Sequence, residues 1–177
     1  MEKRTLGRTG LSVSLLGFGA AELGFLRVDA AESDRILNGV LDAGITLMDT
    51  AGCYVDSEQK IGNALSHRRK EFVLVTKCGH EVDESVAAEW TGQIVRDGVA
   101  RSLRRLKTDH VDVLLLHSCS ADKLQREDLI EALVECKTRG LTRFIGYSGD
   151  ADDAVFAVNM KVFDCLETSV NIADQQA

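Results

Sequence analysis

The sequence predicts an α/β fold in which helices cover a parallel β-sheet. Two observations carry this prediction. Apolar segments such as 72–77 and 111–116 show no regular polar alternation, as expected of strands that are buried on both faces. They alternate along the chain with longer segments of helical periodicity, such as 91–106, which is the order of a parallel sheet with crossover helices.

Length and composition fit one globular domain, which we expect to span residues 1–177. The chain has 177 residues, a usual size for a single domain. Hydrophobic residues make up 45% and charged residues 28%, which excludes a disordered, collagen-like or coiled-coil chain. The formal net charge of −7 argues against nucleic acid as a partner. We expect the basic clusters at 68–70 and 101–107 to lie on solvated helix faces.

The cysteines and apolar segments indicate a cytoplasmic protein without a membrane partner. Five cysteines occur without a C-x-x-C pair, and this odd number suits reduced thiols better than a disulfide framework. No apolar run reaches the length of about 18 residues that spans a bilayer. Leu11, Val13 and Leu15 alternate with serines, which is typical of a strand and not of a signal peptide.

The first half of the chain reads as a hairpin followed by strands and helices in alternation. Gly7 and Gly10 supply the hairpin turn, and Gly44 ends the first helix. Asp56 is expected to cap the second helix, with Gln59 completing a capping box. The predicted elements are a hairpin of 3–6 and 11–14, a buried strand at 15–19, a helix from 31 to 43, a strand at 46–49, a helix after Asp56 and a strand at 72–77.

The second half continues the alternation. Ile94, Val95 and Val99 fall on one face of a helix, and Gly140 ends the helix after it. The predicted elements are a helix at 91–106, a strand at 111–116, a helix around 129–134, a strand at 143–147, a helix at 152–160 and a sixth strand at 162–166.

Two architectures accommodate this order, an open doubly wound sheet and a (β/α)8 barrel. An open sheet favours a glycine-rich phosphate-binding turn after its first strand. The segment that begins with Gly17 and Gly19 fails the G-x-G-x-x-G pattern at Glu22. Polar residues at the strand ends favour the barrel, because barrel enzymes place their chemistry at the carboxyl ends of the strands.

Four polar residues end the predicted strands or follow them closely. Asp49 ends the second strand of the sheet, Lys77 the third and His117 the fourth. Tyr54 lies in the loop after the second strand. The carboxyl ends of parallel strands open on one face, so we expect these side chains to converge. Each residue alone also suits a structural role such as capping or packing, and only the set indicates a site.

Together the four residues would form a proton donor beside a carbonyl-binding point. The ordinary pKa of tyrosine, about 10, is too high for an efficient acid at neutral pH, and the Lys77 ammonium is expected to lower the pKa of Tyr54. Asp49 would keep Lys77 charged, and His117 would donate a hydrogen bond to a substrate oxygen. No side chain supplies a hydride, whereas a nicotinamide cofactor does.

Specific motifs surround these residues and extend over the whole chain. They are Arg4 to Leu11, Gly44 to Ala51 with Tyr54, Ser57-Glu58 with Ile61-Gly62, Val75-Thr76-Lys77, Ser102 to Leu106 with Thr108-Asp109, and Asp112 to His117. On these motifs the chain resembles the aldo-keto reductase family. The resemblance implies a (β/α)8 barrel that reduces an aldehyde or ketone with NADPH, or with NADH as the alternative. It implies Tyr54 as general acid, Lys77 and Asp49 as the residues that tune it, and His117 as the residue that positions the carbonyl.

The resemblance also suggests the cofactor-binding residues, which are Gly19, Asp49, Ser148 and Glu167. Two of these positions depart from the family pattern. Gly149 follows Ser148 where the family often has asparagine, and Glu167 stands where the family usually has glutamine, which adds a charge.

Other functions remain open at this point. The same scaffold is found in cofactor-sensing regulatory subunits, so a binding protein or an inactive fragment is the main alternative. A Schiff-base aldolase would need Lys77 as its nucleophile. A metal site is not expected, because His67, His80, His110 and His117 show no ligand spacing with the cysteines. We interpret Cys53 as a small residue near the pocket. The pair His80-Glu81 follows Lys77 closely, and it is interpreted either as lining the pocket or as a loop pair in solvent.

The strand count predicts an incomplete barrel. A full (β/α)8 barrel needs eight strands and about 250 residues, whereas this sequence indicates an N-terminal hairpin and about six of the eight strands. We therefore expect a chain truncated at its C-terminus that lacks the last βα units. Open sheet edges expose unpaired backbone groups, so we expect self-association through them.

Overall fold

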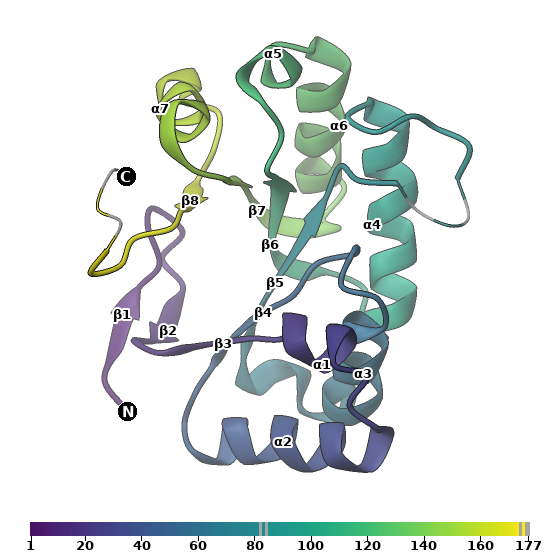
Figure 1. Ribbon diagram of the computed structural model, residues 1–177, viewed down its shortest axis with the longest axis vertical. Coiled ribbons are helices and arrows are strands. Elements are labelled where there is room, and N and C mark those ends of the chain that lie inside the picture. The colour runs from purple at the N-terminus through teal and green to yellow at the C-terminus, as the bar shows by residue number, and fades with distance from the viewer. Residues whose placement is uncertain (82, 84, 174, 176–177) are drawn as a thin grey trace.

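The computed structural model describes residues 1–81, 83, 85–173 and 175, whose strands form two sheets. Strands β1 (Lys3–Thr5) and β2 (Ser12–Ser14) pair as an antiparallel hairpin. The second sheet is parallel, and its strands in spatial order are β3 (Gly17–Gly19), β4 (Leu47–Asp49), β5 (Val73–Cys78), β6 (Val111–His117), β7 (Thr142–Ser148) and β8 (Cys165–Glu167). Spatial order equals chain order, as in a barrel (Figure 1). The predicted fold class, a partial (β/α)8 barrel with an N-terminal hairpin and six strands, is confirmed.

Helices connect the parallel strands and cover the outer face of the sheet. They are α1 (Ala21–Phe25), α2 (Ala30–Asp42), α3 (Ser57–Leu65), the 3-10 helix η1 (Ser66–Glu71), α4 (Gly92–Leu106), α5 (Ala121–Leu124), α6 (Glu127–Thr138) and α7 (Ala151–Met160). Figure 1 shows α2, α3, α4 and α6 on one side of the sheet and the hairpin on the other. The sequence did not predict α1 and α5, which are too short to show helical periodicity, whereas η1 carries the basic cluster at 68–70 that was expected on a helix.

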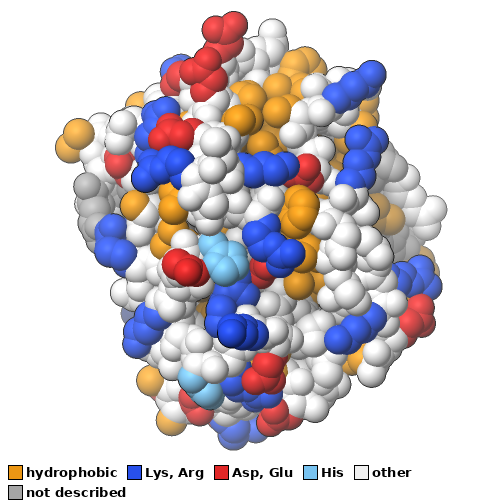
Figure 2. Space-filling view, turned by 180° about the vertical axis from the view of Figure 1, so that it is seen from behind, with side chains coloured by type: hydrophobic (Ala, Val, Ile, Leu, Met, Phe, Trp, Pro, Cys, Tyr) orange, Lys and Arg blue, Asp and Glu red, His pale blue; other side chains and the backbone are white. Residues whose placement is uncertain are grey.

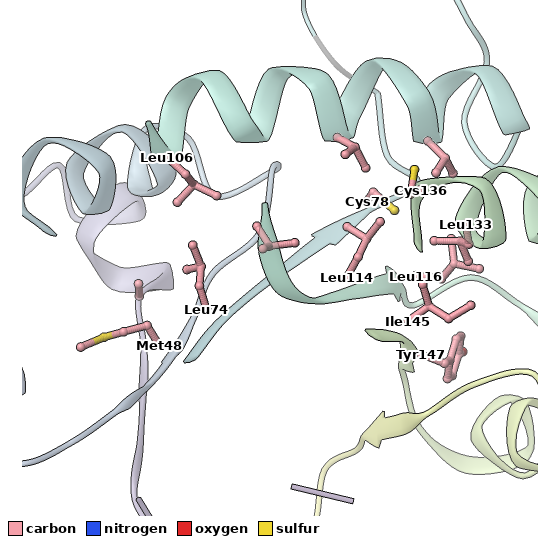
Figure 3. Packing of buried hydrophobic residues seen from close by; sticks show 14 of the residues in the cluster. Met48, Leu74, Cys78, Leu106, Leu114, Leu116, Leu133, Cys136, Ile145 and Tyr147 are labelled. Carbon is pink, nitrogen blue, oxygen red and sulfur yellow. The ribbon is translucent and has the colours of Figure 1, made fainter. Parts of the chain in front are cut away.

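Side chains of the parallel strands alternate between two apolar layers. The outer layer lies between sheet and helices and includes Met48, Leu74, Leu114, Leu116, Ile145 and Tyr147 (Figure 3). The inner layer consists of Leu11, Val13, Val73, Val75, Val113 and Leu115. Strands β5 and β6 are thus buried on both faces, as the absence of polar alternation predicted.

The first predicted buried strand is wrong at its start. Leu15 and Leu16 are 59% and 58% exposed, and β3 begins only at Gly17. These leucines belong to the bend that leads from the hairpin into the sheet, where the Leu15 N–H donates to the Glu2 carbonyl. At the other end, β8 begins at Cys165, three residues later than predicted.

The predicted capping box at Asp56 is also wrong. Asp56 does precede α3, but its carboxylate caps no backbone N–H and instead forms an ion pair with Lys60, at 2.8 Å. Lys60 in turn donates to the Leu23 carbonyl at 2.7 Å. Lys60 therefore ties α3 to α1, and its ion pair with Asp56 competes with the cap for the same carboxylate.

The basic clusters are not solvated throughout, which corrects the prediction for them. Arg69 forms an ion pair with the buried Asp112, at 2.7 Å. Arg101 is buried and donates to the carbonyl of Gly52 in the loop after β4, also at 2.7 Å. Both arginines point into the protein because buried backbone and carboxylate oxygens need hydrogen-bond donors.

The surface mixes charges of both signs. Figure 2 shows Lys and Arg side chains interspersed with Asp and Glu on the face opposite to that of Figure 1, with hydrophobic side chains reaching the surface in its upper half. Within the described residues, no helix combines the length and the apolar composition that crossing a membrane requires. Strands β3 and β8 are the two edges of the parallel sheet, and self-association through them stays a prediction.

Helices α3 and α4 touch through Gly62, and we expect this contact to tolerate no side chain. A Cβ at position 62 would overlap the Arg105 carbonyl and lie 2.8 Å from the Leu106 Cα. Gly62→Ala should lower the free energy of unfolding by about 1–3 kcal/mol. Gly39→Ala in α2 is the control, because nothing lies within 4 Å of its Cβ, and it should stabilise by up to about 1 kcal/mol. Equal effects in urea unfolding would contradict the predicted contact.

Candidate active site

Five polar side chains come together at the carboxyl edge of the parallel sheet. Asp49, His117, Ser148 and Glu167 are the last residues of β4, β6, β7 and β8, and Lys77 is the last but one of β5. The register places Ser148 beside both His117 and Glu167. This is the edge on which barrel enzymes carry their chemistry, and the sequence-predicted convergence is present.

Lys77 is the most buried member of the group. Its side chain is 1% exposed, and its Nζ lies 2.5 Å from Asp49 Oδ1 and 3.3 Å from Glu167 Oε1. Nζ also donates to the Thr50 carbonyl at 3.2 Å. A buried ammonium needs such partners, because charge burial without them is costly. The second carboxylate oxygen of Asp49 is buried without a hydrogen-bond partner in the described residues.

Tyr54 and His117 lie over this ion pair. Lys77 Nζ is 5.4 Å from the centroid of the Tyr54 ring. The Tyr54 and His117 rings meet edge to face, with centroids 5.8 Å apart, and the Phe25 ring also packs against Tyr54, with centroids 5.5 Å apart. All four sequence-predicted catalytic residues are therefore neighbours, although they come from three different strand ends.

The charges around Lys77 keep it protonated. Burial alone would lower the pKa of Lys77, but the carboxylates of Asp49 and Glu167 outweigh this effect and raise it above its ordinary value. Burial raises the pKa of Asp49, an effect that Lys77 opposes and Glu167 reinforces.

The pKa of Tyr54 moves against the prediction from sequence. Burial raises the pKa of Tyr54, and the attraction of its phenolate to Lys77 does not compensate. The negative charges of Asp49, Cys53 and Glu167 also disfavour the phenolate. The prediction that Lys77 lowers the pKa of Tyr54 is therefore wrong as a net effect, because the carboxylates of Asp49 and Glu167 lie beside Lys77 and oppose it.

His117 is held in the neutral form. Burial, Lys77 and His80 together lower the pKa of His117 to about 4. We expect the C2 proton of His117, assigned by its loss in His117→Gln, to titrate by NMR with a midpoint near pH 4 in metal-free buffer. Lys77→Met should raise the midpoint without restoring 6.5, because burial is the larger cause. A wild-type midpoint near pH 6.5 would contradict the inference that burial and neighbouring charges lower the pKa of His117.

The sequence-predicted cofactor residues lie beside the ion pair. Ser148 Oγ donates to Glu167 Oε1 at 2.9 Å, the same oxygen that faces Lys77. Gly19 pairs in register with Asp49 at the sheet edge, and a Cβ on it would meet nothing within 4 Å. Ser148 and Glu167 therefore join the polar cluster, whereas Gly19 borders it through backbone pairing.

Comparison with known proteins supports the family resemblance that the sequence motifs indicate. Residues 15–175 match the model of the aldo/keto reductase family. The chain belongs to the aldo-keto reductase family. It is 35% identical over 158 residues to L-galactose dehydrogenase of Arabidopsis thaliana. That alignment covers 84% of this chain and 49% of the relative. It is 29% identical over 197 residues to an NADH-specific methylglyoxal reductase of Escherichia coli. That alignment covers 99% of this chain and 60% of the relative.

Solved structures of aldo-keto reductases share the fold. An aldo-keto reductase-family protein of Pseudomonas aeruginosa superposes with a TM-score of 0.88 at 33% identity, over 98% of this chain and 69% of that one. The chain spans about half the length of the curated relatives it matches. These relatives are oxidoreductases, and the aldo-keto reductase family uses nicotinamide cofactors.

Two further side chains lie beside His117 in the candidate site. Cys53 Sγ lies 3.4 Å from His117 Nδ1, and the His80 ring packs against that of His117 with centroids 5.2 Å apart. The ligand atoms of Cys53, His80 and His117 all lie within 4.8 Å of one another. Cys53 thus lies near the site, as expected of a small residue beside the pocket, and His80 lies beside His117, as in the pocket-lining alternative. What the sequence did not indicate is that these three side chains lie together. Loop positions directly after strand ends were the available signal.

Proposed function

We propose that the chain reduces an aldehyde or ketone to an alcohol with NADPH as the hydride source. One observation carries the proposal, namely the buried Lys77–Asp49 ion pair under the ring of Tyr54 and beside His117. A structural lysine would not need to be 1% exposed at the carboxyl edge of a barrel sheet, with a tyrosine and a neutral imidazole above it.

Each residue then has a separate role. Tyr54 keeps its proton at neutral pH and donates it to the carbonyl oxygen as that oxygen gains negative charge. The Lys77 ammonium stabilises the phenolate that remains, and Asp49 holds Lys77 in place. The neutral imidazole of His117 donates a hydrogen bond that orients the carbonyl. The hydride is the one component that no side chain supplies, and a bound nicotinamide provides that chemistry.

The residues present fit such a cofactor. The unpartnered Asp49 oxygen can accept a hydrogen bond, and the Ser148 and Glu167 side chains offer a hydroxyl and a carboxylate suited to a carboxamide. Beside them is an apolar cavity of about 280 Å³, lined by Leu47, Asp49, Val75, Val113, Leu115, Leu166 and Glu167. Gly19, Asp49, Ser148 and Glu167 are the residues that would hold the cofactor.

Cofactor binding is the first test. Titration of the 177-residue chain with NADPH should give saturable fluorescence, and a parallel titration with NADH covers the preference named for the E. coli relative. Glu167→Ala should weaken binding by about tenfold or more, the value of one charge-assisted hydrogen bond. Glu135→Ala on the surface of α6 is the control, and this substitution should leave the cofactor dissociation constants unchanged. A folded chain without saturable binding of either cofactor contradicts the proposal.

Turnover separates the two functions that this scaffold allows. Consumption of NADPH in the presence of methylglyoxal or another small carbonyl supports the reductase. Saturable cofactor binding without turnover of any carbonyl would favour the cofactor-sensing binding protein instead. We also propose the cytoplasm as the compartment, since the cysteines are free thiols as a reducing environment requires.

A further inference from the structure

Three side chains at the mouth of the site form a cluster that the reduction does not use as a unit. Cys53 follows β4, His80 follows β5 and His117 ends β6, so three adjacent strands each contribute one residue. Their ligand atoms lie within 4.8 Å of one another. Cys53 Sγ and His117 Nδ1 are 3.4 Å apart.

The donor atoms and their spacing suit zinc. One thiolate and two imidazoles are a common zinc ligand set, and a fourth position then remains open for water. In a tetrahedral site with usual bond lengths, a sulfur and a nitrogen ligand lie about 3.5 Å apart. Cys53 and His117 already have this separation. The ligand atom of His80 lies within 4.8 Å of the other two, so it would need to approach them by at most about 1.5 Å to reach bonding geometry.

His80 is already oriented by a second layer of contacts. Its Nδ1 lies 2.9 Å from Glu89 Oε1, which also accepts the backbone N–H of Glu81 at 3.2 Å. A carboxylate on one ring nitrogen fixes the proton there and leaves Nε2 with a free lone pair. The Trp90 ring packs on His80 with centroids 4.7 Å apart, and the backbone N–H of Trp90 donates to the Gly79 carbonyl at 3.0 Å. Histidines that bind metals usually have such a carboxylate partner.

We propose that Cys53, His80 and His117 form a Zn²⁺ site at the mouth of the active site. On binding, the Cys53 thiol loses its proton to solvent and a sulfur–zinc bond forms, while each imidazole donates one lone pair. No electron is transferred. The Lys77 ammonium would repel the ion, but Asp49 and Glu167 balance it.

Cobalt is the probe for the site, because its spectrum reports both sulfur ligation and geometry. Titration of the chain with Co²⁺ should give one equivalent of tetrahedral d–d absorption together with a thiolate-to-cobalt charge-transfer band, and Zn²⁺ should displace both. Cys53→Ser should abolish the charge-transfer band. Glu89→Gln should keep the band but lower the affinity by about 10–100-fold, as loss of a carboxylate that orients a ligand does.

Cys165→Ser is the matched control, because this half-buried thiol lies at β8 outside the cluster and the variant should keep the full spectrum. Circular dichroism of each variant establishes that it is folded. The proposal is overturned if folded wild-type protein gives no charge-transfer band, if Cys53→Ser retains it, or if Cys165→Ser loses it. The readout is independent of turnover, so its failure leaves the proposed reductase function untouched.

Discussion

Replacing Tyr54 by phenylalanine is expected to slow carbonyl reduction by about 10²–10⁴-fold, the usual contribution of a positioned general acid. The substitution removes only the hydroxyl. The ring keeps its contacts with Phe25 and His117, at centroid distances of 5.5 and 5.8 Å, so the fold and the cofactor site should be preserved. The measurement is NADPH consumption at saturating carbonyl, together with the NADPH dissociation constant, which should not change.

The chain supplies a matched control for this experiment. Tyr147 is its only other tyrosine, and the Tyr147 hydroxyl donates to the Cys119 carbonyl at 2.7 Å, inside the fold. Tyr147→Phe should cost about 1 kcal/mol of stability and leave the turnover rate unchanged. If Tyr54→Phe instead reduces carbonyls at the wild-type rate, Tyr54 is not the acid and the proposed roles of Lys77 and Asp49 lose their basis.

The burial of Tyr54 also fixes how this reaction should respond to pH. Because burial raises the pKa of Tyr54 above its ordinary value of 10, the hydroxyl stays protonated through the neutral range. The rate of reduction should therefore not fall between about pH 6 and pH 9 through loss of the Tyr54 proton. A tyrosine with a lowered pKa, as the sequence suggested, would lose its proton and its acid function within that range.

The fold was predictable because its signals are local. Segments 72–77 and 111–116 are apolar on both faces, which is typical of strands in a parallel sheet covered by helices. The convergence of Asp49, Lys77 and His117 followed from the same argument, since the ends of parallel strands meet at one edge. In both cases a pattern along the chain determines the position in space.

The features that escaped prediction depend on partners that are distant in sequence. Cys53 and His117 are 64 residues apart, and no spacing rule connects them. Arg69 lies in a basic cluster, but its carboxylate partner Asp112 is 43 residues away. The net pKa of Tyr54 required the burial of its ring and the charge of Glu167, which only the folded chain reveals.

Replacing Asp112 by asparagine is expected to lower the free energy of unfolding by about 3 kcal/mol, the lower end of the range for a broken buried ion pair. The Asp112 side chain is 5% exposed, with Arg69 and Arg143 each at 2.7 Å and the Leu74 N–H donating to it at 2.9 Å. Asparagine keeps the volume but leaves two guanidinium groups without their counter-charge. Arg143 is half exposed and can turn to solvent, which moderates the loss.

Asp109→Asn is the control, because this carboxylate is exposed and its partner among the described residues is the adjacent His110, so its loss should change stability by less than about 0.5 kcal/mol.

The pH dependence of the stability difference distinguishes a loss of charge at Asp112 from a change in packing. Burial would raise the pKa of Asp112, but the Leu74 N–H and the two arginines lower it below 3.8, so its charge stabilises the fold above about pH 4 and that contribution fades as pH falls further. The difference in unfolding free energy between wild type and Asp112→Asn should therefore be constant from about pH 5 to pH 8 and shrink below pH 4. A difference that persists unchanged in acid would mean that asparagine disturbs packing between β5 and β6, and that the ion pairs contribute little.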